Sequence, residues 1–379
     1  MRNFTGSVSN ITSQIFAANN GGNAPPVSDV TALVAAANSS SPNAPTGAIA
    51  AALARRDLRG GKNKVLHTIA AIIKDDLVKV SGSIVKQGNV SNWGLTRISS
   101  RINNIDTSTD YTYDSTGGKG VTIFVVDTGV ETNNPEFEGR AIPGREFCTG
   151  CPPVKSAEDT LHGTAVAAIA ASKTYGVAKK AKIVSVRAMS GEGYGRWSDV
   201  IAALQWIKAN ANRSPYRSSL GAIVNLSIEG PVNGVVNRMI AQVQRAGIQV
   251  VIAAGNNAED ACITSPASAT AMFDGNNGPI SVAASDATDS MAYFTNFGSC
   301  VDVIAPGDSV TTIYDMVVSG TSFAAPAVAG TMALYMSANP WLGTPSMRAW
   351  IRYRATKDLI QGTTSDTPNL LLYNTLQGK

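Results

Sequence analysis

The segment Val318-Ser319-Gly320-Thr321-Ser322-Phe323-Ala324-Ala325-Pro326 is the centre from which we interpret this sequence. Gly320 can adopt backbone conformations closed to other residues, and the Ala-rich sequence after it has helical spacing to about Met336. This pattern places the Ser322 hydroxyl at the start of a helix, where unpaired backbone N–H groups favour negative charge. We expect Pro326, which lacks an N–H, in the first helical turn. An ordinary helix cap would produce the same short pattern, so other parts of the chain must distinguish the two.

The composition indicates a globular protein. The chain has 379 residues and 44% hydrophobic content, enough for a large core in one large domain or two to three average ones. Its 31 basic and 27 acidic residues are dispersed, so nucleic-acid binding is not indicated. No run approaches the roughly 18 apolar residues of a membrane span. The first residues also lack the apolar core, roughly 7 to 15 residues long, of a signal peptide.

The N-terminal part differs in composition from the rest. Residues 1–62 are rich in Asn, Ser, Ala, Gly and Pro, and we expect them to be largely disordered. Over residues 63–88, VLHTIAAIIKDD has helical spacing and LVKVSGSIVKQ alternates like a strand, which predicts a small helix–strand unit. The segment after Gln87 is interpreted as a loop-like connection.

From Gly120 onward, hydrophobic strands alternate with helices. The expected strands are 121–127, 182–189, 221–228, 248–255, 280–284 and 301–304. The expected helices are 160–172, 198–211, 235–246, the one that begins near Ser322, and 345–355. Strand, helix and strand in succession predict a parallel sheet flanked by helices, an α/β fold.

Three polar residues lie at the ends of these elements. Asp127 follows a buried run directly, and His162 and Ser322 each begin a helix of small residues. Because functional groups gather at the carboxyl ends of strands in such sheets, we expect the three to converge. A serine hydroxyl needs a base to accept its proton, imidazole has a suitable pKa, and a carboxylate can orient the imidazole. Taken singly, Asp127 could form a turn and His162 could cap a helix.

Three blocks of the sequence resemble the active-site blocks of subtilisin-like serine proteases, in the family's own order: VVDTGV at 125–130, HGTAVA at 162–167 and SGTSFAAP at 319–326. Three further segments resemble the proteinase K group: NPEFEGRA at 134–141, TYGVAKKAKI at 174–183 and AAGNNA at 253–258. The resemblance implies a three-layer subtilisin-like fold over residues 89–379, with a mainly parallel central sheet. It also implies a serine endopeptidase that acts through an Asp127–His162–Ser322 triad and an acyl-enzyme.

The resemblance implies further site residues. The side chain of Asn256 and the backbone N–H of Ser322 match the donors of the oxyanion hole. Gly193-Tyr194-Gly195 resembles the edge that pairs with an extended peptide, and Ser227-Ile228-Glu229 resembles a wall of the first specificity pocket. Trp197 falls where an aromatic residue often lines a deeper subsite, with a role in the core as the alternative.

Three positions depart from the family pattern. Ala165 and Ala327 stand where the family usually has histidines outside the triad, so we expect activity to survive. Glu229 stands where a glycine is usual, and it either narrows the pocket or attracts basic side chains. A catalytically silent relative that acts as a binding protein is the alternative. A lipase-type hydrolase is less supported because G-x-S-x-G is absent.

The cysteines and one carboxylate bear on cofactors and location. Cys262 and Cys300 resemble the positions of a disulfide in some members, and that bridge would indicate an oxidising compartment. For Cys148 and Cys151 the even count permits a second disulfide; reduced thiols are the alternative, and a zinc half-site is less supported. No cofactor is implied for the chemistry. A structural calcium ion remains an option at Asp302, which resembles a calcium-binding carboxylate.

The unit from Lys64 to Gln87 resembles the last helix and strand of an inhibitory propeptide. We therefore interpret residues 1–88 as a prosegment-like region and expect cleavage between Val85 and Asn92. The resemblance implies a secreted enzyme, or alternatively a vacuolar one. We expect it to act as a monomer on protein or peptide substrates and to bind its own prosegment.

Overall fold

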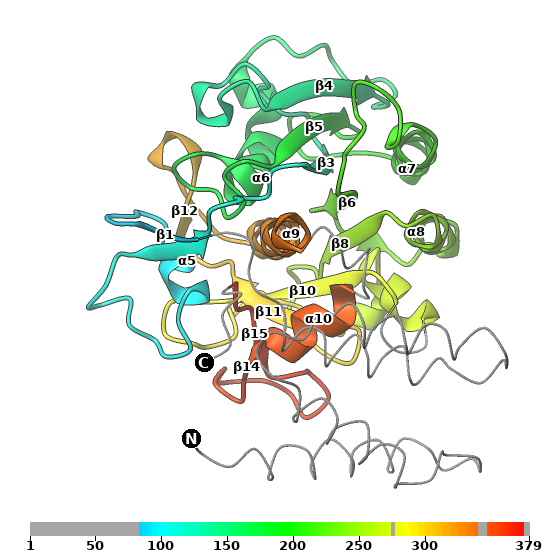
Figure 1. Cartoon of the computed structure of the whole chain (residues 1–379). Coiled ribbons are helices and arrows are strands. Elements are labelled where there is room, and N and C mark those ends of the chain that lie inside the picture. Colours follow the sequence, from blue (N-terminus) through cyan, green and yellow to red (C-terminus); the bar gives the residue numbers. More distant parts are fainter. Residues whose placement is uncertain (1–82, 274–276, 340–346, 375–379) are drawn as a thin grey trace, which may run out of the picture. The chain divides into compact units, whose positions relative to one another are not determined.

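The structure, a computed structural model, describes residues 83–273, 277–339 and 347–374 (Figure 1). The chain divides into two units, Met1–Val78 and Lys79–Lys379, and all the described residues belong to the second. The disorder expected over residues 1–62 and the helix expected from Lys64 therefore lie outside the described residues. The end of the expected N-terminal strand is described: β1 (Ile84–Gln87) pairs antiparallel with β2 (Tyr111–Asp114).

A nine-stranded sheet forms the centre of this unit. Its strands are β3 (Val121–Asp127), β4 (Ala141–Glu146), β5 (Lys182–Arg187), β6 (Gly221–Leu226), β8 (Gln249–Ala253), β10 (Ile280–Ser285), β11 (Val303–Pro306), β14 (Thr356–Lys357) and β15 (Leu370–Leu371). The order is β14-β15-β11-β10-β8-β6-β3-β5-β4, and every neighbouring pair is parallel except β14 and β15. The expected parallel sheet is confirmed.

Helices cover both faces of the sheet. One hydrophobic core contains residues of α5 (Trp93–Ile98), α6 (Leu161–Ala171), α9 (Thr321–Ala338) and α10 (Met347–Arg354). The other contains residues of α7 (Trp197–Asn210) and α8 (Gly234–Arg245). In Figure 1, α6 and α9 lie on one side of the strands and α7 and α8 on the other. This arrangement confirms the three-layer fold, and it explains why the strands read as continuous hydrophobic runs.

Two elements differ from the expectation. Helix α5 forms where a loop was expected; it has six residues, too few to show a period, and the side chain of Asn92 accepts the N–H of Gly94 at 2.9 Å. Strand β4 was not expected, and it contains Pro143 and Gly144, residues that are unfavourable inside a strand. It lies at the edge of the sheet, and its register shifts between Pro143 and Arg145, two conditions under which a strand tolerates proline.

Helix α9 is buried along its whole length except at Ser322. Gly320 precedes it with φ of 149°, a conformation that favours glycine, as expected. Pro326 is not in the first turn, because the helix begins at Thr321 and Pro326 is its sixth residue. The missing N–H of Pro326 would have bonded to the Ser322 carbonyl oxygen, which instead accepts the hydroxyl of Ser227 at 2.7 Å. The proline thus leaves this oxygen available for a contact between distant segments.

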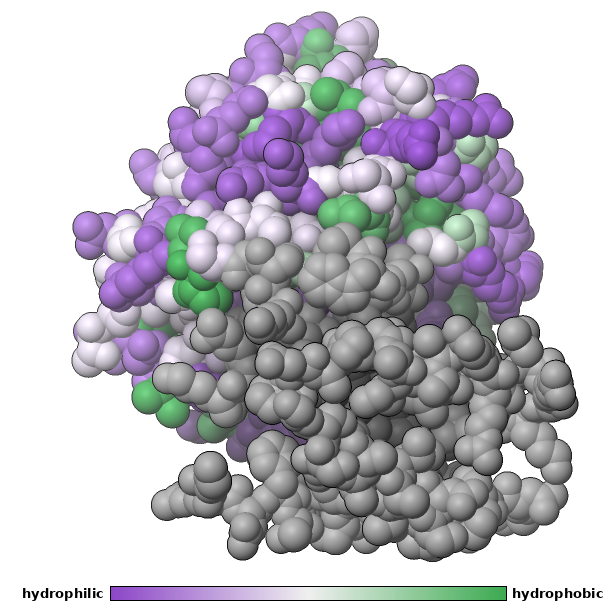
Figure 2. Space-filling model, viewed as in Figure 1, coloured by the Kyte–Doolittle hydropathy of each residue, from purple (hydrophilic) through white to green (hydrophobic). Residues whose placement is uncertain are grey.

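In the coloured part of the surface that Figure 2 shows, polar side chains predominate and hydrophobic ones form small, separate groups. Among the helices in the described part of the chain, none is both long and apolar enough to cross a bilayer.

Candidate active site

The candidate site lies where β3, β6 and β8 end. Strand β3 lies between β5 and β6. After β3, the chain forms β4 and β5 on one side of it and then β6 and β8 on the other, so the loops leave the sheet in opposite directions at this point. Asp127 is the last residue of β3 and Ser227 follows β6 directly. Asn256 lies three positions after the last residue of β8. The topology therefore gathers residues that are far apart in the sequence.

Asp127 and His162 are in direct contact. Asp127 is fully buried, and its Oδ1 lies 2.7 Å from His162 Nδ1 and accepts the Thr128 N–H at 2.7 Å. Next to the histidine, a Cβ on Gly163 would collide with the Gly129 carbonyl oxygen and touch the aspartate. A glycine therefore allows α6 to begin this close to the end of β3. With Nδ1 donating to the carboxylate, Nε2 is the nitrogen that can accept a proton.

The pKa of His162 is raised above its ordinary value. Burial lowers it, but the negative charge of Asp127 and the hydrogen bond to it act in the opposite direction and prevail. Among the described residues, no donor reaches Asp127 Oδ2. The buried negative charge of Asp127 is therefore compensated mainly through Oδ1, by His162 and the Thr128 N–H. The arrangement favours proton uptake by the imidazole, as a general base requires.

Ser322 is the second residue of α9 and is partly exposed. Its Oγ donates to the Ser227 carbonyl oxygen at 3.4 Å, and its own carbonyl accepts the Ser227 hydroxyl. The His162 ring packs against the ring of Phe323, the next residue, with centroids 5.4 Å apart. The structure thus joins Asp127 to His162 and brings the imidazole beside the start of α9, while the Ser322 hydroxyl is bonded to Ser227.

Asn256 lies beside the same helix start. Its Oδ1 accepts the backbone N–H of Thr321 at 2.8 Å and the Thr321 hydroxyl at 3.0 Å. These two bonds identify the oxygen and hold it against the residue that precedes Ser322. The side-chain nitrogen of Asn256 is therefore the group that can donate elsewhere, which fits the expected oxyanion donor.

The two expected substrate walls differ in exposure. Gly193, Tyr194 and Gly195 are exposed in a turn where the Ser190 N–H donates to the Tyr194 carbonyl at 2.8 Å; Tyr194 is 75% exposed. The turn explains φ of 83° at Gly193. Its exposed backbone is suited to an added strand.

In the second wall, Ser227 and Ile228 are buried, and the Ile228 side chain belongs to the core that contains α7 and α8. Trp197 packs against that core, and a Cβ on Gly230 would lie 2.8 Å from its ring. Trp197 thus has the core contacts of the alternative interpretation and also borders the residue after Glu229.

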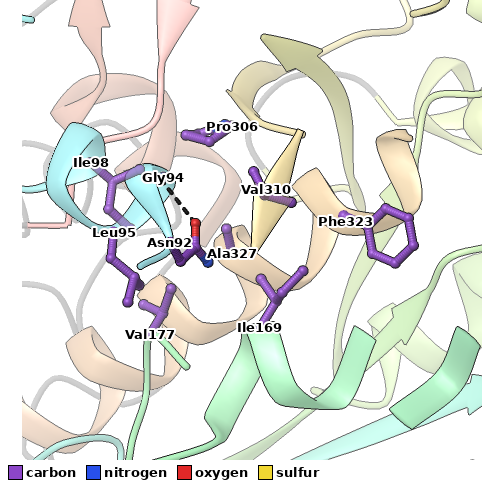
Figure 3. Close-up of a pocket in the computed structure, with 10 residues that line it drawn as sticks. All are labelled: Asn92, Gly94, Leu95, Ile98, Ile169, Val177, Pro306, Val310, Phe323 and Ala327. Carbon is purple, nitrogen blue, oxygen red and sulfur yellow. Dashed lines mark hydrogen bonds between the residues drawn. The ribbon is translucent and has the colours of Figure 1, made fainter. Parts of the chain in front are cut away.

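The two positions that depart from the expected histidines carry only the methyl side chain of alanine. Ala165 and Ala327 are buried in the core that contains α6 and α9. Figure 3 shows a small pocket in this region, with Ala327 and Phe323 on α9 and Ile169 on α6 among its lining residues. These positions therefore carry packing and no polar chemistry.

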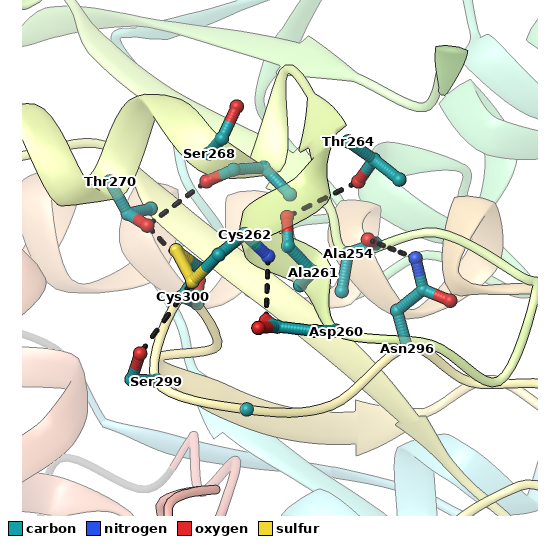
Figure 4. Close-up of a disulfide and its surroundings, with 12 residues drawn as sticks. Ala254, Asp260, Ala261, Cys262, Thr264, Ser268, Thr270, Asn296, Ser299 and Cys300 are labelled. Carbon is teal, nitrogen blue, oxygen red and sulfur yellow. Dashed lines mark hydrogen bonds between the residues drawn. A yellow bond between two sulfur atoms is a disulfide. The ribbon is translucent and has the colours of Figure 1, made fainter. Parts of the chain in front are cut away.

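All four cysteines are paired. Cys262 forms a disulfide with Cys300, as the resemblance implied, and Figure 4 shows Asp260 beside it, accepting the Cys262 N–H at 2.8 Å. Cys148 forms a second disulfide with Cys151, so the reduced-thiol and zinc alternatives are wrong.

Asp302 does not fit a calcium site. It is fully buried, and its Oδ1 accepts Arg348 Nε at 2.8 Å and Arg352 Nη1 at 2.9 Å, while Oδ2 accepts the Ser281 N–H at 3.1 Å. Two guanidinium groups thus supply the positive charge that the resemblance assigned to calcium. Within residues 83–273, 277–339 and 347–374, no three His, Cys, Asp or Glu side chains are placed to hold a metal ion together. The contacts give Asp302 the role of anchoring α10 to the sheet.

We predict that Asp302→Asn lowers the free energy of unfolding by about 3 kcal/mol, because the neutral amide loses the charge-assisted bonds that the buried carboxylate makes to Arg348 and Arg352. Urea unfolding should give the same loss with calcium or with a chelator. Asp110→Asn is the control, since its ion pair with Lys86 is on the surface and should matter little. Calcium that stabilises the wild type but not Asp302→Asn would identify Asp302 as a calcium ligand after all.

Comparison with known proteins yields consistent matches. The family model described as "Subtilase family" matches residues 118–370. The subtilase-type proteinase psp3 of Schizosaccharomyces pombe is 36% identical over 81% of this chain and 67% of its own length. The subtilisin-like serine protease Pen c 1 of Penicillium citrinum is 40% identical over 80% and 72%. The cuticle-degrading protease of Metarhizium anisopliae is 36% identical over 80% and 74%.

The fold has a counterpart of known structure. The crystal structure of a cold-adapted subtilisin-like serine proteinase matches with a TM-score of 0.66 and 33% sequence identity. The match covers 76% of this chain and 99% of that chain.

Proposed function

Because this chain belongs to the subtilase family and is a serine-type endopeptidase, we propose that it cleaves proteins through an Asp127–His162–Ser322 triad with an acyl-enzyme on Ser322. The observation that carries the proposal is the 2.7 Å contact between the buried Asp127 carboxylate and His162, beside the partly exposed Ser322 at the start of α9.

The first chemical step would be attack of Ser322 Oγ on the scissile carbonyl carbon. The hydroxyl exchanges its 3.4 Å bond to Ser227 for one to His162 Nε2, which takes the proton. Asp127 stabilises the imidazolium that results. The Asn256 side-chain nitrogen and the Ser322 N–H, which has no partner inside the first helical turn, then donate to the oxyanion.

Collapse of the tetrahedral intermediate would break the peptide C–N bond. The imidazolium gives its proton to the leaving amine, and the acyl group stays on Ser322 Oγ. Water then attacks the ester with His162 as base, and the proton returns to Ser322 when the acid leaves. We place the substrate as an extended strand between residues 193–195 and 227–229, because the backbone of the first segment is exposed.

We also propose that the enzyme is made as a zymogen and works in an oxidising compartment outside the cytosol. Two disulfides support the compartment. The exposure of Lys86, Gly88 and Asn89, just before the buried Val90, supports accessible cleavage between Val85 and Asn92.

A peptidyl organophosphonate tests the function. We expect stoichiometric labelling, with mass spectrometry placing the adduct on Ser322, because the reagent requires a nucleophile activated by a base. Ser319→Ala is a matched control and should label normally, since the Ser319 hydroxyl bonds to Asp308. A folded protein that binds peptide but resists labelling would support the catalytically silent alternative.

A further inference from the structure

The carboxylate of Glu229 bridges the ends of two neighbouring strands. Glu229 follows β6, and its Oε2 accepts the backbone N–H of Asn256, which follows β8, at 2.9 Å. Its Oε1 accepts the side-chain nitrogens of Asn257 at 2.8 Å and Asn296 at 3.2 Å. Both oxygens are thus engaged by N–H donors, so the side chain is held as a connector between the two strand ends.

The packing around this carboxylate is tight. Gly255 has φ of 112°, and a Cβ there would collide with both Glu229 Oε1 and Asn296 Nδ2. Asn296 is fully buried and uses both ends of its amide: Nδ2 also donates to Ala254 (Figure 4), and Oδ1 accepts the Asn257 N–H at 2.9 Å. The position of the Glu229 side chain is therefore defined by its surroundings.

Asn256 is consequently held at two points. Glu229 bonds to its backbone N–H, and Thr321 bonds to its side-chain oxygen. With both points fixed, the side-chain nitrogen of Asn256 has a defined direction beside the start of α9. We propose that Glu229 is a positioning residue, which orients Asn256 toward the oxyanion of the transition state. This inference rests on the proposed protease function.

The contacts distinguish this role from those expected from the sequence. Glu229 was expected to narrow the pocket or to attract basic side chains. A lysine or arginine of the substrate would have to compete with three N–H donors that already occupy both oxygens. Burial also raises the pKa of Glu229, only partly offset by the N–H groups of Asn256, Asn296 and Asn257. The geometry points to support of the oxyanion donor.

Glu229→Gln is the primary test. The glutamine amide presents N–H to groups that are themselves donors, so at least one of the three bonds is lost. We expect kcat for a peptide anilide with phenylalanine at the cleaved bond to fall about tenfold, with KM nearly unchanged, because the oxyanion forms only after substrate binding. Glu229→Ala should change kcat in the same direction. The matched control is Glu259→Gln. Glu259 accepts the same Asn257 amide at 3.2 Å, and this variant should retain wild-type kcat.

A double-mutant cycle with Asn256→Ala tests the route of the effect. Asn256→Ala alone should lower kcat by 10²–10³, the range known for such a donor in subtilisin, a member of this family. If Glu229 acts through Asn256, adding Glu229→Gln to Asn256→Ala should lower kcat no further. Thermal unfolding of each variant would correct the rates for the folded fraction.

Three results would overturn the inference: wild-type kcat in both Glu229 variants, additive losses in the cycle, or a loss confined to KM for substrates with arginine at the cleaved bond. In each case the wild type still cleaves peptides, so the proposed function stands. A wild type that neither cleaves peptides nor reacts with the organophosphonate would instead remove the proposed function, and with it this inference.

Discussion

Ser322→Ala is expected to lower kcat for peptide hydrolysis by about 10⁶-fold, the loss known for the corresponding change in subtilisin, a member of the family. The acyl-enzyme requires the Ser322 oxygen, and no bond to the substrate can form without it. The fold should survive, because the hydroxyl makes one long bond of 3.4 Å and alanine is a good helix former. Rates on a peptide anilide and on casein would measure the change.

The comparison protein for this experiment is Ser319→Ala, which removes a hydroxyl three positions earlier in the same segment and should retain most activity. Thermal unfolding should give similar transition temperatures for both variants. Undiminished casein digestion by Ser322→Ala would show that another residue is the nucleophile and would remove the triad assignment.

Asp127→Asn is expected to lower kcat by about 10⁴-fold, as in other enzymes with this triad. The side chain keeps its size, but the amide nitrogen can donate to His162 Nδ1, which favours the tautomer with a proton on Nε2. That tautomer cannot accept the proton of Ser322. The fold should be retained, since the substitution keeps the size of the side chain and leaves the neighbouring Gly163 N–H bonded to the Thr128 hydroxyl.

The pH dependence of the residual activity gives a second measurement on Asp127→Asn. His162 must be neutral to act as base, so wild-type kcat/KM should fall as the pH drops through its raised pKa. Without the charge of Asp127, burial alone remains and lowers the pKa, so the acid limb should move to lower pH. Asp308→Asn, which alters a carboxylate bonded to Ser319, should leave the limb in place. An unchanged limb in Asp127→Asn would mean that the carboxylate does not set the pKa of the base.

The order of most strands and helices and the residue types of the candidate triad can be predicted from the amino-acid pattern alone. Strands buried on both faces must be continuously hydrophobic, and helices that begin with small residues can approach a sheet closely, so both leave a local pattern. The motif at 319–326 also predicts the conformation of Gly320, because the geometry of a turn depends on neighbouring residues. Helix α5 and strand β4 were not predicted. The helix is too short to show a period, and the strand contains a proline that only an edge strand tolerates.

The pairing of the buried polar groups, in contrast, becomes apparent only once the chain is folded. Ser227 compensates for the N–H that Pro326 lacks, from 95 positions away from Ser322. Arg348, 46 positions from Asp302, provides charge where calcium was considered, and Glu229 reaches Asn256 across 27 positions. Hydrophobic burial follows the local period of the chain. Satisfying a buried carboxylate depends on donors that meet only when the sheet has formed, and this is why the roles of Glu229 and Asp302 could not be predicted from their neighbours.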